Sequence, residues 1–282
     1  MLRNHKRCLV TVGAAVTAAA AALPGAAANA AVAGPEQPLV AHTAALPVIT
    51  VTMDGKTITV GGALVSGGVK VVSTVTGEPA GGPQFIRLHK GVTVAQFFKA
   101  AQGDPNNAAP IASIVFSPRA PKGTSSAQVS LQPGHYVAAD AGPTPPVFTT
   151  FTITKAASPA PLPAPQARMS SIEFGFRGPG TLQNGDLVRF GNDGFLVHMM
   201  VAARGASLAG AQKIAKLWKE GKKAQQLFTG VTSFFDILSH GAFQQQVVHL
   251  RPGFWVLACF MDTQDGREHT QLGMERVIHI TN

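Results

Sequence analysis

Four residues of types that bind soft metal ions stand in the second half of the chain. Cys259, His269 and Met274 follow one another with the spacing Cys-x9-His-x4-Met, between two predicted strands, and His198 stands at the end of an earlier strand pair. A thiolate and a thioether favour Cu(I), whereas imidazoles bind both Cu(I) and Cu(II). Together they form the ligand set of a blue-copper site, in which copper changes oxidation state with little movement of its ligands.

Residues 1–30 have the pattern of a secretory signal peptide, with a basic stretch, an uncharged Ala/Val run and small residues before a cleavage point after Ala30. Cleavage lowers the formal net charge from +9 to +6, since three basic residues and no acidic ones leave, and it removes Cys8. Without an Arg-rich aromatic motif, this mild charge argues against nucleic-acid binding.

The apolar run of the signal sequence is short for a membrane span of about 20 residues. We therefore expect a secreted or cell-envelope protein with no membrane span after cleavage and with an association with the cell surface. The alternative is an uncleaved membrane anchor.

Taken singly, each candidate ligand has a simpler interpretation. His198 alone is more often a core or surface histidine, Met274 is ordinary core filler, and Cys259 is a small buried hydrophobe. The combination favours a metal site, because one unpaired Cys is unusual in an exported protein. Zinc is an alternative for one Cys and two His, although Met274 then has no role. The other alternative is a β-sandwich that contains these residues without binding a metal ion.

The composition predicts an all-β chain. Only 13% of the residues are charged, and 30 Gly and 20 Pro fit short strands and turns better than long helices. A flexible segment (31–46) precedes a first half (47–154), and a Pro/Ala linker (155–168) leads to a second half (169–282). We expect two tandem antiparallel β-sandwiches of the Greek-key type.

Each half also contains one predicted helical insertion. The first is Val94–Gln102 after Thr93, and the second is Leu208–Lys223 after Ser207. Thr and Ser are favoured N-cap residues.

The two halves resemble each other in sequence. Leu131–Asp140 matches Leu250–Cys259 without a gap, which places Asp140 at the position of Cys259. Gln84 and His198 each stand seven residues before a glycine that precedes a predicted helix. The first half is therefore predicted to lack copper ligands and to serve as a scaffold, a spacer or a partner-binding module.

The second half resembles the cupredoxins, the family of type 1 blue-copper sandwich proteins. The whole chain resembles a secreted actinobacterial-type protein that carries such a domain at its C-terminus. The resemblance to the cupredoxins covers residues 169–282. It rests on Asn192-x5-His198, on Pro-Gly-x-Trp-Val-Leu-Ala-Cys before and at Cys259, on His-x4-Met and on a final strand. It implies one copper ion with His198 and His269 as equatorial nitrogen ligands, Cys259 as the thiolate and Met274 as the axial ligand.

The sequence departs from that family in two ways. Nine residues separate Cys259 from His269, more than in small electron carriers, and Met199 stands where those proteins often have Asn.

The expected function is single-electron transfer through copper to an unidentified redox partner. Copper storage or delivery without redox turnover is one alternative, and a non-metal extracellular interaction module is another. We expect no enzyme activity. Oxidases and nitrite reductases of this family have a His immediately before the copper Cys, where this chain has Ala258, and the sequence contains no His-x-His motif.

Overall fold

A computed structural model describes residues 45–140 and 147–282 of the chain. The predicted signal peptide and nearly all of segment 31–46 lie outside the described residues. The described residues belong to one compact unit. None of their helices has the length and apolar character that a membrane crossing requires.

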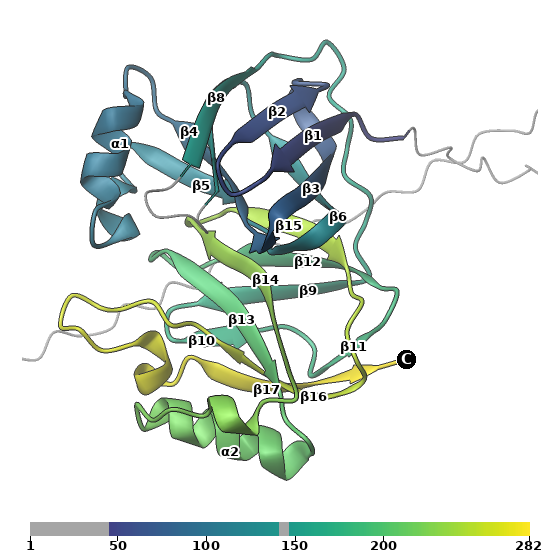
Figure 1. Ribbon diagram of the computed structural model, residues 1–282, viewed down its shortest axis with the longest axis vertical. Coiled ribbons are helices and arrows are strands. Elements are labelled where there is room, and N and C mark those ends of the chain that lie inside the picture. The colour runs from purple at the N-terminus through teal and green to yellow at the C-terminus, as the bar shows by residue number, and fades with distance from the viewer. Residues whose placement is uncertain (1–44, 141–146) are drawn as a thin grey trace, which may run out of the picture. The chain divides into compact units, whose positions relative to one another are not determined.

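The described part of the first half contains eight strands, one α-helix and one 3-10 helix (Figure 1). They are β1 (Val48–Met53), β2 (Ile58–Gly62), β3 (Gly67–Gly81), β4 (Pro83–Leu88), α1 (Val94–Ala101), η1 (Pro105–Ala108), β5 (Ala112–Phe116), β6 (Ala120–Leu131), β7 (Gly134–Asp140) and β8 (Val147–Ile153).

The second half contains nine strands, one α-helix and two 3-10 helices, all within the described residues. They are β9 (Ala167–Ile172), β10 (Gly175–Arg177), β11 (Thr181–Gln183), β12 (Leu187–Asn192), β13 (His198–Arg204), α2 (Leu208–Lys219), η2 (Gln225–Leu227), β14 (Gly230–Leu238), β15 (Phe243–Val247), β16 (Gly253–Ala258), η3 (His269–Leu272) and β17 (Glu275–Thr281).

These strands form three sheets, and the described chain is mostly β with two α-helices, which agrees in part with the predicted all-β class. The largest sheet has the order β10-β9-β12-β15-β6-β3-β1-β2, and the others have the orders β11-β17-β16-β13-β14 and β5-β4-β7-β8. One apolar core includes Val71 of β3 and Phe85 of β4. A second core includes Phe190 of β12 and Leu257 of β16. Each smaller sheet therefore packs against strands of the large one.

The prediction of purely antiparallel sheets is wrong. β1 pairs in parallel with β3, β9 with β12, and β11 with β17. The cause is a crossover in the chain path. β1 and β2 form an antiparallel hairpin, and β3 then returns along the other edge of β1 in the direction of β1.

The two halves share a sheet, so the expected pair of separate sandwiches is not confirmed. Gln245 of β15 pairs with Gln128 of β6, which joins strands of both halves. Buried polar contacts reinforce this junction, including the Ser117 amide, which donates to Gln244 Oε1 at 2.9 Å. A buried amide has no water to bond, so this hydrogen bond satisfies its donor and stabilises the junction between the two halves.

Both predicted helices begin where expected. Thr93 Oγ1 accepts from the Gln96 amide at 3.2 Å, and the Gln96 side chain accepts from the Thr93 amide, which forms a capping box. Ser207 Oγ accepts from the Gly210 amide at 3.1 Å. α2 ends at Lys219 instead of Lys223.

The matching segments of the two halves carry the same hydrogen bonds. Arg87 donates to the Pro133 carbonyl at 3.3 Å, and Arg204 donates to the Pro252 carbonyl at 2.8 Å. Since Pro133 and Pro252 occupy matching positions, the turn before β7 and the turn before β16 are held in the same way.

The aromatic residues that follow these turns also correspond. Tyr136 Oη donates to the Gln132 carbonyl at 2.7 Å, and Trp255 Nε1 donates to the Arg251 carbonyl at 3.0 Å. In each case the acceptor stands four residues before the ring, so an aromatic side chain pins the start of its strand.

Strand register corrects one expected correspondence. Gln84 pairs with Ala139, whereas the matching Ala258 pairs with Val201 and not with His198. Val201 is therefore the counterpart of Gln84. The difference of three residues lies in the connection between strand and helix, because α1 begins ten residues after Gln84 whereas α2 begins seven residues after Val201.

Candidate metal centre

Three of the four predicted ligands meet in the structure. His198 Nδ1 lies 3.2 Å from His269 Nδ1 and 3.7 Å from Cys259 Sγ, and His269 Nδ1 lies 3.4 Å from the same sulfur. All three side chains are buried. Among the described residues, this is the one group of His, Cys, Asp or Glu side chains with metal-binding proximity.

The three ligand atoms have the separations that a bound metal requires. For a triangle with edges of 3.2, 3.4 and 3.7 Å, the product of the edges divided by four times the area gives a circumradius of about 2.0 Å. Metal–imidazole bonds are about 2.0–2.1 Å long and metal–thiolate bonds about 2.3 Å. One small metal ion therefore fits among these atoms without a rearrangement of the backbone.

The fourth predicted ligand, Met274, is buried in the same core cluster as Cys259. Its backbone is tied to both neighbouring ligands, since its amide donates to the His269 carbonyl at 3.0 Å and its carbonyl accepts from the Cys259 amide at 3.4 Å. The side chain of Met274 as an axial ligand remains a prediction.

Two strand ends and a short 3-10 helix position the ligand loop. Cys259 directly follows β16, and His269 is the first residue of η3, where its amide donates to the Met261 carbonyl at 2.8 Å. Gly273 ends η3 with a φ of 100°, a left-handed conformation that suits glycine. This turn brings Met274 back beside Cys259 at the start of β17.

Asn192 shapes the approach to His198. Its Nδ2 donates to the Leu196 and Leu238 carbonyls at 2.7 and 2.8 Å, and its Oδ1 accepts from the Gly194 amide at 2.9 Å. Leu238 is the strand partner of His198. The buried Asn192 side chain therefore holds the loop before His198 onto the strand beside it, which explains the Asn-x5-His spacing.

Burial sets the protonation of the free thiol. Burial raises the pKa of Cys259 to about 11, although the Met199 amide, which donates to Cys259 Sγ at 3.4 Å, lowers it in part. The metal-free site therefore holds a thiol at neutral pH. A metal ion must displace that proton to gain the thiolate.

The imidazoles are held neutral. Burial lowers the pKa of His198 to about 4, with a further contribution from the neighbouring His269. Burial also lowers the pKa of His269, against the opposing charges of Asp262 and Asp104. Neutral imidazoles present a lone pair to a metal ion, so both rings are ready to bind one at neutral pH.

The sequence alone did not reveal Glu173, which lies behind His198. Glu173 Oε1 is 3.8 Å from His198 Nε2, an electrostatic contact longer than a hydrogen bond. The same oxygen accepts from the Phe195 and Leu196 amides. Burial raises the pKa of Glu173, but the hydrogen bonds from these two amides and the nearby His198 together lower it, and the net shift is downward. A carboxylate behind a metal-binding imidazole orients the ring and increases its basicity.

The first half also reaches the site, which the sequence did not indicate. Asn106 Oδ1 of η1 accepts from the Val197 amide at 2.6 Å, one residue before His198. The neighbouring Asp104 acts electrostatically on His269. Both contacts join residues more than 90 positions apart, so no local pattern could have identified them.

A pocket of about 540 Å³ lies at this junction. Its lining includes Asp104 and Asn106 from the first half and Phe174, Asp262 and Leu272 from the second. The Phe174 ring packs edge-on against His269 with 5.3 Å between ring centroids. The buried Nε2 atom of His269 makes no hydrogen bond to any described residue. The Nδ1 atom of His269 is the ring nitrogen that faces His198 Nδ1 and Cys259 Sγ.

No family model and no curated protein sequence matches this chain. Solved structures with similarity include the dithionite-reduced auracyanin of Roseiflexus castenholzii, with 16% identity, 41% of this chain and 95% of that chain covered, and a TM-score of 0.26. A multicopper oxidase matches at 12% identity over 83% of this chain and 88% of its own, with a TM-score of 0.23. The Blue Copper Oxidase of Nitrosomonas europaea matches at 12% identity over 83% and 76%, with a TM-score of 0.20. At these TM-scores, the argument for copper rests on the site itself.

The expectation that the chain is not an enzyme is contradicted by this comparison. It was drawn from Ala258 and from the missing His-x-His motif, yet several multicopper oxidases are similar over 83% of the chain or more. The absence of two local motifs does not exclude an enzyme activity.

Proposed function

We propose that the chain is an exported, cupredoxin-like protein that holds one type 1 copper ion and transfers single electrons through it. His198, Cys259 and His269 are the proposed equatorial ligands, and Met274 is the proposed axial ligand. The observation that carries this proposal is the buried triangle of two Nδ1 atoms and one Sγ atom with edges of 3.2, 3.4 and 3.7 Å.

The donor set favours copper over zinc. Two neutral imidazoles and a thiolate suit either metal, but a buried methionine beside the thiolate suits copper. A bound copper ion would supply a one-electron redox couple. The chain's own contribution is to keep the three side chains fixed and dry, because burial excludes water and the surrounding backbone hydrogen bonds restrict ligand movement when the charge changes.

The remaining proposals concern organisation and location. We propose a signal peptide at 1–30, a degenerate cupredoxin-like half at 47–154 without copper ligands, a linker at 155–168 and the copper-binding half at 169–282. The recurring Arg–Pro and aromatic–carbonyl hydrogen bonds support a tandem repeat. The resulting interpretation is a secreted or envelope-bound protein that exchanges electrons with a partner protein.

The test is a titration of the purified full chain with Cu(II), followed by visible absorption. One equivalent should produce an intense thiolate-to-copper band, and Cys259→Ser should abolish it. The matched control is His249→Gln, which alters an exposed histidine outside the site and should leave the band unchanged.

Voltammetry then separates redox function from storage. A reversible one-electron wave in the copper-loaded chain supports electron transfer. Tight copper binding without such a wave would indicate copper storage or delivery instead of electron transfer. A wild-type chain that stays colourless after Cu(II) addition and keeps a reactive thiol would overturn the copper site.

A further inference from the structure

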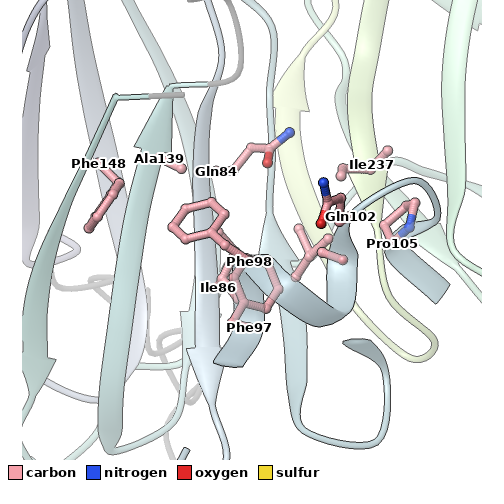
Figure 2. A pocket seen from close by; sticks show the side chains of 11 residues that line it. Gln84, Ile86, Phe97, Phe98, Gln102, Pro105, Ala139, Phe148 and Ile237 are labelled. Atoms are coloured by element: carbon pink, nitrogen blue, oxygen red, sulfur yellow. The ribbon is translucent and has the colours of Figure 1, made fainter. Parts of the chain in front are cut away.

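A cavity of about 600 Å³ lies in the first half, between α1 and the outer face of the β5-β4-β7-β8 sheet (Figure 2). Most of its lining is apolar and includes Ile86, Phe97, Phe98 and Ile114. Ile86, Phe97 and Ile114 are buried core residues, so these walls are fixed by packing. The volume falls within the range of about 300–1,000 Å³ that small-molecule sites occupy.

Two carboxamides interrupt the apolar lining. Figure 2 shows Phe148 at one end of the cavity and Ile237 and Pro105 at the other, with Gln84 and Gln102 between them. Neither glutamine side chain hydrogen-bonds to another described residue. Each carboxamide offers two N–H donors and a carbonyl acceptor, so together they can fix the orientation of a ligand that carries one polar group.

The second half shows what occupies the corresponding space there. Val137 and Ala139 of the first half face α1, and their sequence counterparts Val256 and Ala258 face α2. α1 has 8 residues, whereas α2 has 12.

The longer helix places the Trp218 indole over this sheet face, where it is 5% exposed. Edge-on contacts to Phe260 and Phe228, at centroid distances of 5.0 and 5.5 Å, hold the ring. The space between helix and sheet is thus filled by the Trp218 ring in the second half, whereas it contains an open cavity in the first half.

We infer that the cavity of the first half binds a flat aromatic molecule that carries one hydrogen-bond donor. The rings of Phe97 and Phe98, whose centroids are 5.2 Å apart, offer edge and face contacts to such a ring. The carbonyl oxygen of Gln84 or Gln102 accepts from its donor. A molecule of this class gains the contacts that Trp218 makes in the second half. The site stands apart from the metal ligands and does not depend on copper.

The probe is indole, titrated into the copper-free full chain and observed by ligand-detected NMR, with 1-methylindole as the donor-free comparison. Indole should bind with a Kd below about 1 mM, as expected for a small ligand of high efficiency. 1-Methylindole should bind about fivefold more weakly, because one hydrogen bond is lost. No saturation by indole up to about 5 mM would overturn the proposal.

Two sets of variants locate the site. Ala101→Phe fills the cavity from α1 and should weaken indole binding about tenfold or more. Its matched control is Ala95→Phe, the same change at an exposed position of that helix outside the lining, which should have no effect.

The double variant Gln84→Leu/Gln102→Leu should bring the affinities of indole and 1-methylindole together while leaving an apolar cavity. Equal binding by Ala101→Phe and wild type, or an unchanged preference in the double variant, would show that indole binds elsewhere.

Discussion

In both halves an arginine of a neighbouring strand donates to a proline carbonyl, and an aromatic ring is tied to the carbonyl four residues before it. The strands that begin at these turns then end differently. β7 ends at the buried Asp140, whereas β16 is followed by the buried Cys259. Identical scaffolding therefore leads to a carboxylate in one half and to a thiol between two imidazoles in the other.

The difference shows that the repeated strands alone do not build the metal centre. The second half adds an irregular start to β13, where His198 pairs with Leu238 ahead of two register shifts, and η3, which places His269 beside Cys259. The first half has neither imidazole at these places, but it contributes Asn106 to the backbone beside His198. The half that lacks the proposed ligands thus supports the half that has them.

The largest expected effect comes from making the two halves alike at the strand end. Cys259→Asp replaces the soft thiolate with the carboxylate found at Asp140, and the affinity for Cu(I) should fall at least about a thousandfold. Competition with a Cu(I) chelator measures the change. Cys259→Ser should give a comparable loss if Cys259→Asp folds poorly, while Asp140→Asn should keep wild-type affinity. A comparable loss of Cu(I) affinity in Asp140→Asn would place the copper ion in the first half and contradict the proposed site.

The buried imidazoles should make the copper-free chain sensitive to acid. The unfolded chain takes up a proton on His198 near the ordinary pKa of 6.5, but the folded chain does so only near 4. Between these values the unfolded state binds more protons, so stability falls as the pH drops from about 6.5 to 4, by up to about 3 kcal/mol.

Urea unfolding of the copper-free chain at pH 7 and pH 5 measures this loss. His198→Gln should remove most of the pH dependence. In contrast to His198, His89 and His135 of the first half are exposed, and replacing either with Gln should leave the acid sensitivity in place. An identical pH dependence in His198→Gln and wild type would contradict the role given to burial.

Removing the carboxylate behind His198 should weaken the site without destroying it. Glu173→Gln should lower Cu(II) affinity by about tenfold, since a carboxylate increases the basicity of the ring that it faces. The affinity for Cu(I) should fall less, so the reduction potential should rise. Glu220→Gln, on the surface at the end of α2, is the control. A drop of equal size for both oxidation states would reduce Glu173 to a purely structural role.

The smallest expected effect tests whether the first half supports the metal centre. Asn106→Ala leaves the Val197 amide without its acceptor and should cost about 1 kcal/mol of stability. It should also shift the copper absorption band, because the amide lies next to His198. Asn107→Ala, at the exposed neighbouring position, should change neither. A stability loss with an unshifted band would limit Asn106 to joining the two halves.

Local patterns predicted much of the fold and the three side chains that the structure brings together, His198, Cys259 and His269. Thr93 and Ser207 cap their helices as expected, because capping depends on residues only three positions apart. The Cys-x9-His-x4-Met spacing also places its ligands on one loop between two strands. By contrast, the parallel pairing of β1 with β3 depends on the path of the chain, which no local pattern contains.

Long-range contacts explain what the sequence missed at the site. Glu173 precedes His198 by 25 positions, and Asn106 precedes Val197 by 91. The Gln84–His198 correspondence failed for a related reason. Spacing to a glycine does not report which residues pair with β7 and β16, and that pairing shows that the connection from strand to helix is three residues longer in the first half.

The most direct test of the copper site is X-ray absorption at the copper edge of the Cu(II)-loaded full chain. The account predicts two nitrogen neighbours near 2.0 Å and one sulfur near 2.2–2.3 Å, about the distances of imidazole and thiolate bonds. Cys259→Ser should lose the sulfur neighbour. A shell of only nitrogen and oxygen atoms in the wild-type chain would contradict the assignment of Cys259, His198 and His269 to one copper ion.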